Sequence, residues 1–158
     1  MNGNGIVNVS GSGAFKLVGT VAGNVYVEDG AELIGEGSVL GDLTLDGNMN
    51  INLDELDTLF TVNGAVAGDG TIQFFADDFM DYLDQQVPFL TSTGSSLGDI
   101  SSLYSFPEIS EEYMWTYGQN GNLFWVGVTE AGAEGVPEPS TWALLVLGVA
   151  GLMYWRKK

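Results

Sequence analysis

The stretch that decides the fold runs from residue 24 to residue 37 and reads Asn24-Val25-Tyr26-Val27-Glu28-Asp29-Gly30-Ala31-Glu32-Leu33-Ile34-Gly35-Glu36-Gly37. Apolar and small polar residues alternate in Asn24–Val27, and Ile6–Val9 has the same alternation. A period of two residues is typical of a β-strand. Glycine next to Asp or Asn closes each strand, as turns with positive φ require. The stretch therefore predicts short strands joined by tight turns.

The pattern repeats from Ile6 to Phe75. Glycine recurs there at a constant interval, at Gly13, Gly30, Gly47 and Gly64. A second alignment, whose interval is one residue longer, pairs Val7 with Val25 and Leu43, and Val9 with Val27 and Leu45. A shift of one residue between units is what a β-bulge produces. Units of this length are too small to bury a core alone, so they predict the stacked coils of a β-solenoid.

The repeat resembles the passenger repeats of bacterial autotransporters and related surface proteins. Asn24–Gly37 is the best stretch, and Val39–Gly47 continues in the same style. The resemblance implies an all-β fold, a right-handed parallel β-helix with coils of about 17–18 residues. Residues 6–75 would supply about four coils, with neighbouring strands ~4.8 Å apart. Lys16 and Asn50 occupy positions where an apolar residue was expected, so we interpret these coils as imperfect.

Residues 76–128 differ in character and predict a terminal cap. Apolar residues at 75, 79, 80 and 83 have helical spacing, so a short helix is expected there. Val87–Leu90 predicts a strand, and Ser92–Ser102 predicts a loop rich in serine and glycine. Met114–Tyr117 and Leu123–Val128 predict a hairpin that closes near Asn120-Gly121, a favoured two-residue turn.

Aromatic residues crowd the predicted hairpin, at Tyr113, Trp115, Tyr117, Phe124 and Trp125. We interpret them as a plug over the open end of the solenoid, and the alternative is a stacking platform for sugars. Thr129–Val136 has the composition of a linker. The expected organisation is a solenoid over 1–75, a cap over 76–128, a linker over 129–136 and a distinct tail over 137–158.

The charge balance of the 158-residue chain is strongly acidic, with 21 Asp and Glu against 4 Lys and Arg, for a net charge of -17. Such a surface repels nucleic acids and anionic lipid headgroups, so no nucleic-acid partner is expected. The chain has no cysteine and no histidine, which removes thiol chemistry, the commonest general base and the commonest transition-metal ligand. We therefore expect a protein that is not an enzyme, with no catalytic residue, metal site or cofactor.

Acidic residues gather in two places, Asp77, Asp78, Asp81 and Asp84 in one and Asp54, Glu55 and Asp57 in the other. Neither group has the spacing of a Ca²⁺-binding EF-hand loop, so a solvated acidic face is preferred over a Ca²⁺ site. Paired carboxylates could serve glycoside hydrolysis, but with 21 acids some pair always falls close. Polysaccharide lyases also use β-helices, yet outside the tail Lys16 is the only basic residue. A carbohydrate-active β-helix protein, a lyase or glycan binder whose active residues lie further upstream, remains the alternative.

The carboxyl-terminal tail has three parts. Pro137, Glu138, Pro139 and Ser140 form a polar strip, which proline keeps extended. An uncharged run follows, made of Trp142, Ala143, Leu144, Leu145, Val146, Leu147, Gly148, Val149, Ala150, Gly151, Leu152, Met153, Tyr154 and Trp155. Arg156, Lys157 and Lys158 end the chain. As a helix the run would span about 21 Å, short of a bilayer core of ~30 Å. Trp142, Tyr154 and Trp155 are placed as interfacial anchors, and the basic side chains can snorkel.

This order of parts closely resembles the PEP-CTERM sorting signal of bacterial surface proteins. The resemblance implies that exosortase, a membrane processing enzyme, recognises Pro137-Glu138-Pro139 while the helix holds the chain in the inner membrane. The basic end belongs in the cytoplasm, which places residues 1–140 on the outer side. The expected destination is the cell surface or extracellular matrix, with extracellular polysaccharide as a further partner. The alternatives are a permanent tail anchor of an interaction module and a buried helix of the globular domain.

The first residues, Met1–Gly5, have neither the basic region nor the long apolar region of a secretory signal peptide. A tail that demands export is inconsistent with a chain that lacks an export signal. We therefore expect the protein to continue upstream, with further coils that cover the open strand edge of the first one.

Overall fold

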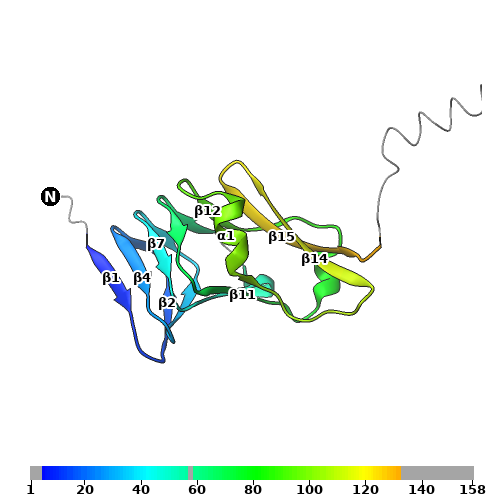
Figure 1. Ribbon diagram of the computed structural model, residues 1–158, viewed down its shortest axis with the longest axis horizontal. Coiled ribbons are helices and arrows are strands. Elements are labelled where there is room, and N and C mark those ends of the chain that lie inside the picture. Colours follow the sequence, from blue (N-terminus) through cyan, green and yellow to red (C-terminus); the bar gives the residue numbers. More distant parts are fainter. Residues whose placement is uncertain (1–4, 57–58, 133–158) are drawn as a thin grey trace, which may run out of the picture.

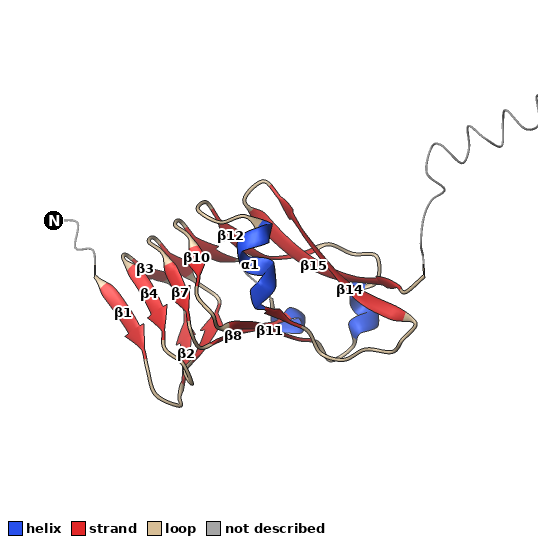
Figure 2. Ribbon diagram, viewed as in Figure 1, coloured by secondary structure: helices blue, strands red, loops and turns tan. Residues whose placement is uncertain are grey.

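The computed structural model describes residues 5–56 and 59–132, and β-strands dominate them (Figures 1 and 2). The strands form three open sheets. The first sheet has the order β1 (Ile6–Val9), β4 (Asn24–Val27), β7 (Leu43–Leu45) and β10 (Val66–Ala67). The second has the order β2 (Ala14–Leu17), β5 (Glu32–Gly35), β8 (Asn48–Asn52), β11 (Thr71–Phe75) and β13 (Tyr104–Ser105). The third has the order β3 (Thr20–Val21), β6 (Ser38–Val39), β9 (Phe60–Val62), β12 (Val87–Ser92), β15 (Leu123–Glu130) and β14 (Tyr113–Asn120).

Short helical turns interrupt the strands, at η1 (Leu53–Glu55), η2 (Phe79–Tyr82), α1 (Leu97–Ile100) and η3 (Ser101–Leu103). The predicted helix near residue 79 is therefore one 3-10 turn, and the Asp78 side chain caps its start by accepting from the Met80 amide. Within the described residues no helix combines the length and the apolar character that crossing a bilayer requires.

The chain visits the three sheets in turn, so each passage adds one strand to each sheet. Parallel pairing joins Val7 to Val25 and Leu43, and Val9 to Val27 and Leu45. The longer of the two repeat alignments is thereby confirmed for the strands β1, β4 and β7. The shorter glycine interval is wrong as a guide to register. Gly13, Ala31 and Gly47 lie next to one another at the turn before the second sheet, where the carbonyl of each accepts from the following passage of the chain. Gly64 instead lies at the turn before the first sheet, where its amide donates to the Gly41 carbonyl.

Later passages are longer than the first two. Leu43 pairs with Val66, and Phe60 pairs with Leu90. The added residues contain η1 between β8 and β9, and η2 between β11 and β12. The sheets keep their parallel pairing from β9 to β12 across these insertions. The expected coil length consequently holds only at the start of the chain.

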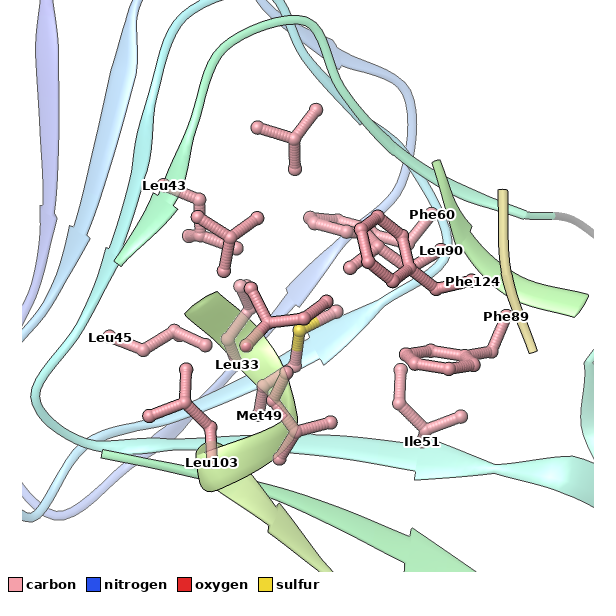
Figure 3. Close-up of a cluster of buried hydrophobic side chains, with 14 of the residues drawn as sticks. Leu33, Leu43, Leu45, Met49, Ile51, Phe60, Phe89, Leu90, Leu103 and Phe124 are labelled. Atoms are coloured by element: carbon pink, nitrogen blue, oxygen red, sulfur yellow. The ribbon is translucent and has the colours of Figure 1, made fainter. Parts of the chain in front are cut away.

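The interior is filled by side chains that project from all three sheets, because alternate residues of each strand point inward. Figure 3 shows Leu43 and Leu45 from the first sheet, Met49 and Ile51 from the second, and Phe60 and Leu90 from the third around one space. Each of these side chains is at most 1% exposed. Their burial supplies the main free energy that holds the sheets together.

The outward column of the second sheet corrects one sequence interpretation. Lys16 pairs with Ile34, which pairs with Asn50, which pairs with Gln73. The inward column beside it holds Phe15, Leu33, Met49 and Ile72. Lys16 and Asn50 are therefore not imperfections of the core, because both occupy positions that face away from it.

The last passage builds the end of the fold differently. Helix α1 contacts β10, β13 pairs in parallel with β11, and β15 pairs antiparallel with β12. Strands β14 and β15 form the predicted hairpin, which is longer at both ends than expected, and Gly121 has a φ of 61° in its turn. The predicted strand at Val87–Leu90 extends to Ser92.

The loop expected over Ser92–Ser102 is wrong in its second half, where α1 and η3 lie. Ser96 and Asp99 form a capping box at the helix start, where the Ser96 amide and hydroxyl donate to the Asp99 carboxylate across 2.8 Å and 2.6 Å. Hydrogen bonds from the Ser96 hydroxyl and amide hold the pKa of Asp99 below its ordinary value. A Ser-x-x-Asp spacing favours helix initiation, even though the surrounding serine and glycine suggest a loop.

Candidate functional site

The residues predicted to act in sorting lie outside the described part of the chain. These are Pro137, Glu138, Pro139 and Ser140, the segment 142–155, and the basic group Arg156, Lys157 and Lys158. The predicted division into four segments, at 75, 128 and 136, also stays a prediction. The described residues contain two further features with recognisable chemistry, an aromatic cluster and a groove on the opposite face of the hairpin.

The structure separates the five aromatic residues of the hairpin onto two faces. Paired residues of an antiparallel ladder share a face, so the pairs Trp115–Val128 and Tyr117–Val126 lie on the side of the core. Phe124 is fully buried on that side. Trp125 pairs with Gly118 and therefore projects from the other face. The platform proposed as an alternative for sugars thus cannot consist of all five rings.

On the core side, Phe106 lies at the centre of a stack of rings. Its ring centroid is 4.9 Å from that of Phe74, 5.2 Å from Trp115 and 5.9 Å from Tyr117, in planes that differ by at most 18°. Trp115 also donates its indole N–H to the Pro107 carbonyl across 3.0 Å. The stack connects β11, the segment after β13, and β14. Trp115 and Tyr117 therefore pack within the protein, whereas the plug over the end of the solenoid stays a prediction.

Tyr104 borders the same stack and packs edge-on against Phe74 and Tyr117. No partner for its buried hydroxyl lies within the described residues. Burial raises the pKa of Tyr104 well above its ordinary value, and the neighbouring Tyr117 adds to the effect. The phenol consequently stays neutral over the whole physiological range.

Replacing Phe106 with alanine is expected to destabilise the fold by about 2 kcal/mol, because a half-buried ring loses its stacking partners and leaves a void. Phe75→Ala is the matched control, since Phe75 neighbours Phe74 in β11 but is 47% exposed. Urea denaturation of the full chain would measure both variants, and the control should fall within ~0.5 kcal/mol of the parent. Equal midpoints for the two variants would remove the structural role assigned to the stack.

On the outer face, Trp125 is part of a groove of about 270 Å³, which we name the Trp125 groove. It is lined by Asp84, Gln85, Gln86, Thr116, Trp125, Val128 and Thr129. The half-buried indole lies over Gly118, where any Cβ would overlap the ring. The indole N–H is buried without a partner among the described residues, so packing rather than hydrogen bonding positions the ring.

The rim of the groove, residues 84–86, is fixed against β15. The Asp84 amide donates to the Val128 carbonyl across 2.8 Å, and the Gln85 side chain donates to the Asp81 carbonyl across 2.5 Å. Gly127 allows the rim to approach, because a Cβ there would overlap the Gln85 carbonyl oxygen. Asp84 has a φ of 55°, which is uncommon for a residue other than glycine. Sequence reasoning placed Asp84 in an acidic group and missed the groove.

The two acidic groups of the sequence meet at Asp54. Its carboxylate accepts from the Tyr82 hydroxyl across 2.5 Å and from the Asp77 amide across 2.6 Å. Burial, and secondly the bond to Asp54, raise the pKa of Tyr82. Asp57 lies outside the described residues. In residues 5–56 and 59–132, no three acidic side chains converge closely enough to hold a metal ion.

A smaller hollow of about 140 Å³ lies beside Lys16, Glu36 and Asn50. Lys16 donates to Glu36 across 2.7 Å, and this hydrogen bond and the charge of Glu36 raise the pKa of Lys16. The side-chain amide oxygen Oδ1 of Asn50 is buried and has no partner in the described part of the chain. Because the ammonium group is already engaged, this hollow offers less to a ligand than the Trp125 groove does.

Comparison with known proteins finds a match at the end of the chain. Residues 135–158 match the family model described as the PEP-CTERM protein-sorting motif. Neither a curated protein nor a solved structure matches the chain. The matched range contains the Pro-Glu-Pro strip, the apolar run and the basic end. The carboxyl-terminal segment is therefore a PEP-CTERM sorting motif, which indicates an exported protein that passes through the membrane and is processed by the membrane enzyme exosortase.

Proposed function

We propose that this chain is a non-catalytic protein of the cell surface or extracellular matrix, delivered there through its sorting motif. The observation that carries the proposal is the match of residues 135–158 to the PEP-CTERM motif. In this proposal, exosortase recognises Pro137-Glu138-Pro139, and the segment 142–155 holds the chain in the inner membrane until processing. Arg156–Lys158 then marks the cytoplasmic end.

We further propose that the strand-rich body is a right-handed parallel β-helix that serves as a displayed stalk. Support comes from the parallel registers of the three sheets and from the inward columns of apolar side chains. A stacked architecture suits a surface protein, since each coil contacts only its neighbours and presents an extended outer surface. The likeness to autotransporter repeats belongs to the same proposal.

The proposal that the protein is not an enzyme rests on composition and on the pairing of Lys16. The sequence has neither histidine nor cysteine, and Lys16 is the one basic residue before the tail. Its ammonium group is bound to Glu36. A lyase needs a base and a cation beside an acidic sugar, and this side chain is poorly available for either task. An extracellular polysaccharide is proposed as a binding partner rather than a substrate.

The proposed sorting predicts the mass of the mature carboxyl terminus. The surface form of the protein should lack Arg156–Lys158, because exosortase removes the membrane segment before release. Mass spectrometry of the carboxyl-terminal peptide, taken from surface and inner-membrane fractions of the same cells, measures this directly. The inner-membrane fraction serves as the control and should retain the basic residues. An intact basic end on the surface form would instead establish a permanently anchored interaction module.

A further inference from the structure

We propose that the Trp125 groove binds a single neutral pyranose unit of a saccharide. The inference deepens the proposed matrix function and rests on it for the source of the saccharide. The groove lies on the face of the β14–β15 hairpin opposite the aromatic stack, so its ligand would not disturb the core.

The shape of the groove fits one flat ring. Gly118 has no side chain, so the indole of Trp125 can lie over the neighbouring strand, and this half-buried ring lines the groove. The C–H face of a pyranose is apolar, and its contact with an aromatic face buries apolar area from both partners. A volume of about 270 Å³ is slightly below the range of roughly 300–1,000 Å³ that is usual for ligand pockets, which favours one sugar ring over a longer chain.

The polar lining matches the edge of a pyranose, which carries hydroxyl groups around its rim. Asp84 supplies a carboxylate acceptor, Gln86 an amide with both donors and acceptor, and Thr116 and Thr129 hydroxyl groups. Hydrogen bonds from these groups would orient the ring after stacking has positioned it. A few polar groups around an apolar surface are the usual composition of a small-molecule site.

The groove is also preorganised. Bonds from the Asp84 amide to the Val128 carbonyl and from the Gln85 side chain to the Asp81 carbonyl hold the backbone of the rim before any ligand arrives, which lowers the entropy cost of binding. The positive φ of Asp84 is consistent with this role, since backbone strain is often retained at ligand sites. The close approach of Gln85 to Gly127 prevents the rim from moving inward.

Charge selects the class of sugar. Among the described residues no basic side chain lines the groove, Asp84 places a carboxylate at its rim, and the whole chain has a net charge of -17. Uronates and sulfated sugars would be repelled by this field. Neutral hexoses and N-acetylhexosamines carry no such penalty, and they are the ligands that the proposal specifies.

Titration of the full chain with glucose, galactose, mannose and N-acetylglucosamine tests the site. The protein is kept in a zwitterionic detergent, because detergents with sugar headgroups would occupy the groove. Saturation-transfer NMR and calorimetry should detect saturable binding of at least one neutral sugar, with glucuronate and galacturonate at least tenfold weaker. Binding that is absent for every neutral sugar, or stronger for the uronates, would overturn the proposal.

Variants locate the binding. Trp125→Leu retains an apolar side chain but removes the aromatic face, and it should weaken the affinity at least tenfold. Asp84→Asn and Gln86→Ala change exposed rim groups without a core contact, and each should weaken it several-fold. Asparagine tolerates the positive φ of residue 84. Met114→Ala is the matched control, since Met114 lies on the same face of β14, is 51% exposed and does not line the groove.

Unchanged affinity in Trp125→Leu or in both rim variants would place any sugar elsewhere and overturn the assignment. Should Trp125→Leu lose its fold by circular dichroism, the rim variants decide the question alone. These measurements use purified protein and are independent of export. Failure of the sorting proposal would appear only in the mass of the carboxyl terminus, and failure of the groove only in the titrations.

Discussion

Replacing Gly47 with alanine is expected to destabilise the fold by about 3 kcal/mol, at the upper end of the range for overpacking. A Cβ at this position would overlap the carbonyl oxygens of Glu28 and Ala31, which belong to the preceding passage of the chain through the sheets. The Gly47 amide also donates to the Val27 carbonyl of that passage. Backbone rather than a flexible side chain is in the way, so the two passages must separate to relieve the clash.

Gly13→Ala is the matched control for Gly47→Ala. Gly13 occupies the position equivalent to Gly47 at the turn before the second sheet, and a Cβ there meets no atom within 4 Å. Its substitution should be neutral or slightly stabilising, because alanine restricts the unfolded chain. The urea midpoint of the full chain measures both effects at constant slope. A loss of less than ~1 kcal/mol for Gly47→Ala would mean that the backbone around Gly47 is not packed as closely as described.

The double substitution of Pro137 and Pro139 by alanine is expected to abolish most release of the protein from the inner membrane. Proline disfavours helical backbone and alanine favours it, so the substitution should make the Pro-Glu-Pro strip less extended. A processing enzyme that reads an extended backbone would then lose its substrate. Immunoblots of membrane, surface and medium fractions would show the unprocessed chain accumulating in the inner membrane.

Pro88→Ala controls for a general effect of losing a proline. Pro88 is exposed on β12, outside the sorting motif, so its substitution should leave the distribution among fractions unchanged. Release of the double variant at the rate of the parent would contradict recognition of Pro137-Glu138-Pro139.

The sequence predicts the parallel register well where successive passages of the chain through the three sheets have equal length. Val7, Val25 and Leu43 align because apolar side chains with a period of two residues must share the inward face, and a slip of one residue would expose them all. The glycine interval misleads because glycine occurs at more than one kind of turn between the sheets. From the sequence alone, glycines at two different turns that are separated by this interval look the same as one turn that repeats.

The candidate site is predicted less well, because its residues come from separate segments. Sequence reasoning grouped Trp125 with the other hairpin aromatics by proximity alone. The alternation of residues along the strand would have separated the two faces, because Phe124, Val126 and Val128 alternate with Trp125 and Gly127. The position of the rim at residues 84–86 depends on pairing between β12 and β15, which no local pattern in the sequence specifies.

Strand β15 has a mechanical consequence for the stage at which, in the proposed sorting, the carboxyl end still holds the chain in the membrane. It is hydrogen-bonded to β12 on one side and to β14 on the other, and the sorting motif begins at residue 135, shortly after the strand ends at Glu130. Tension applied through the tether therefore enters the body along a strand clamped by two ladders. Extraction of that strand requires both ladders to rupture, so the load-bearing attachment is stronger than an edge strand would provide.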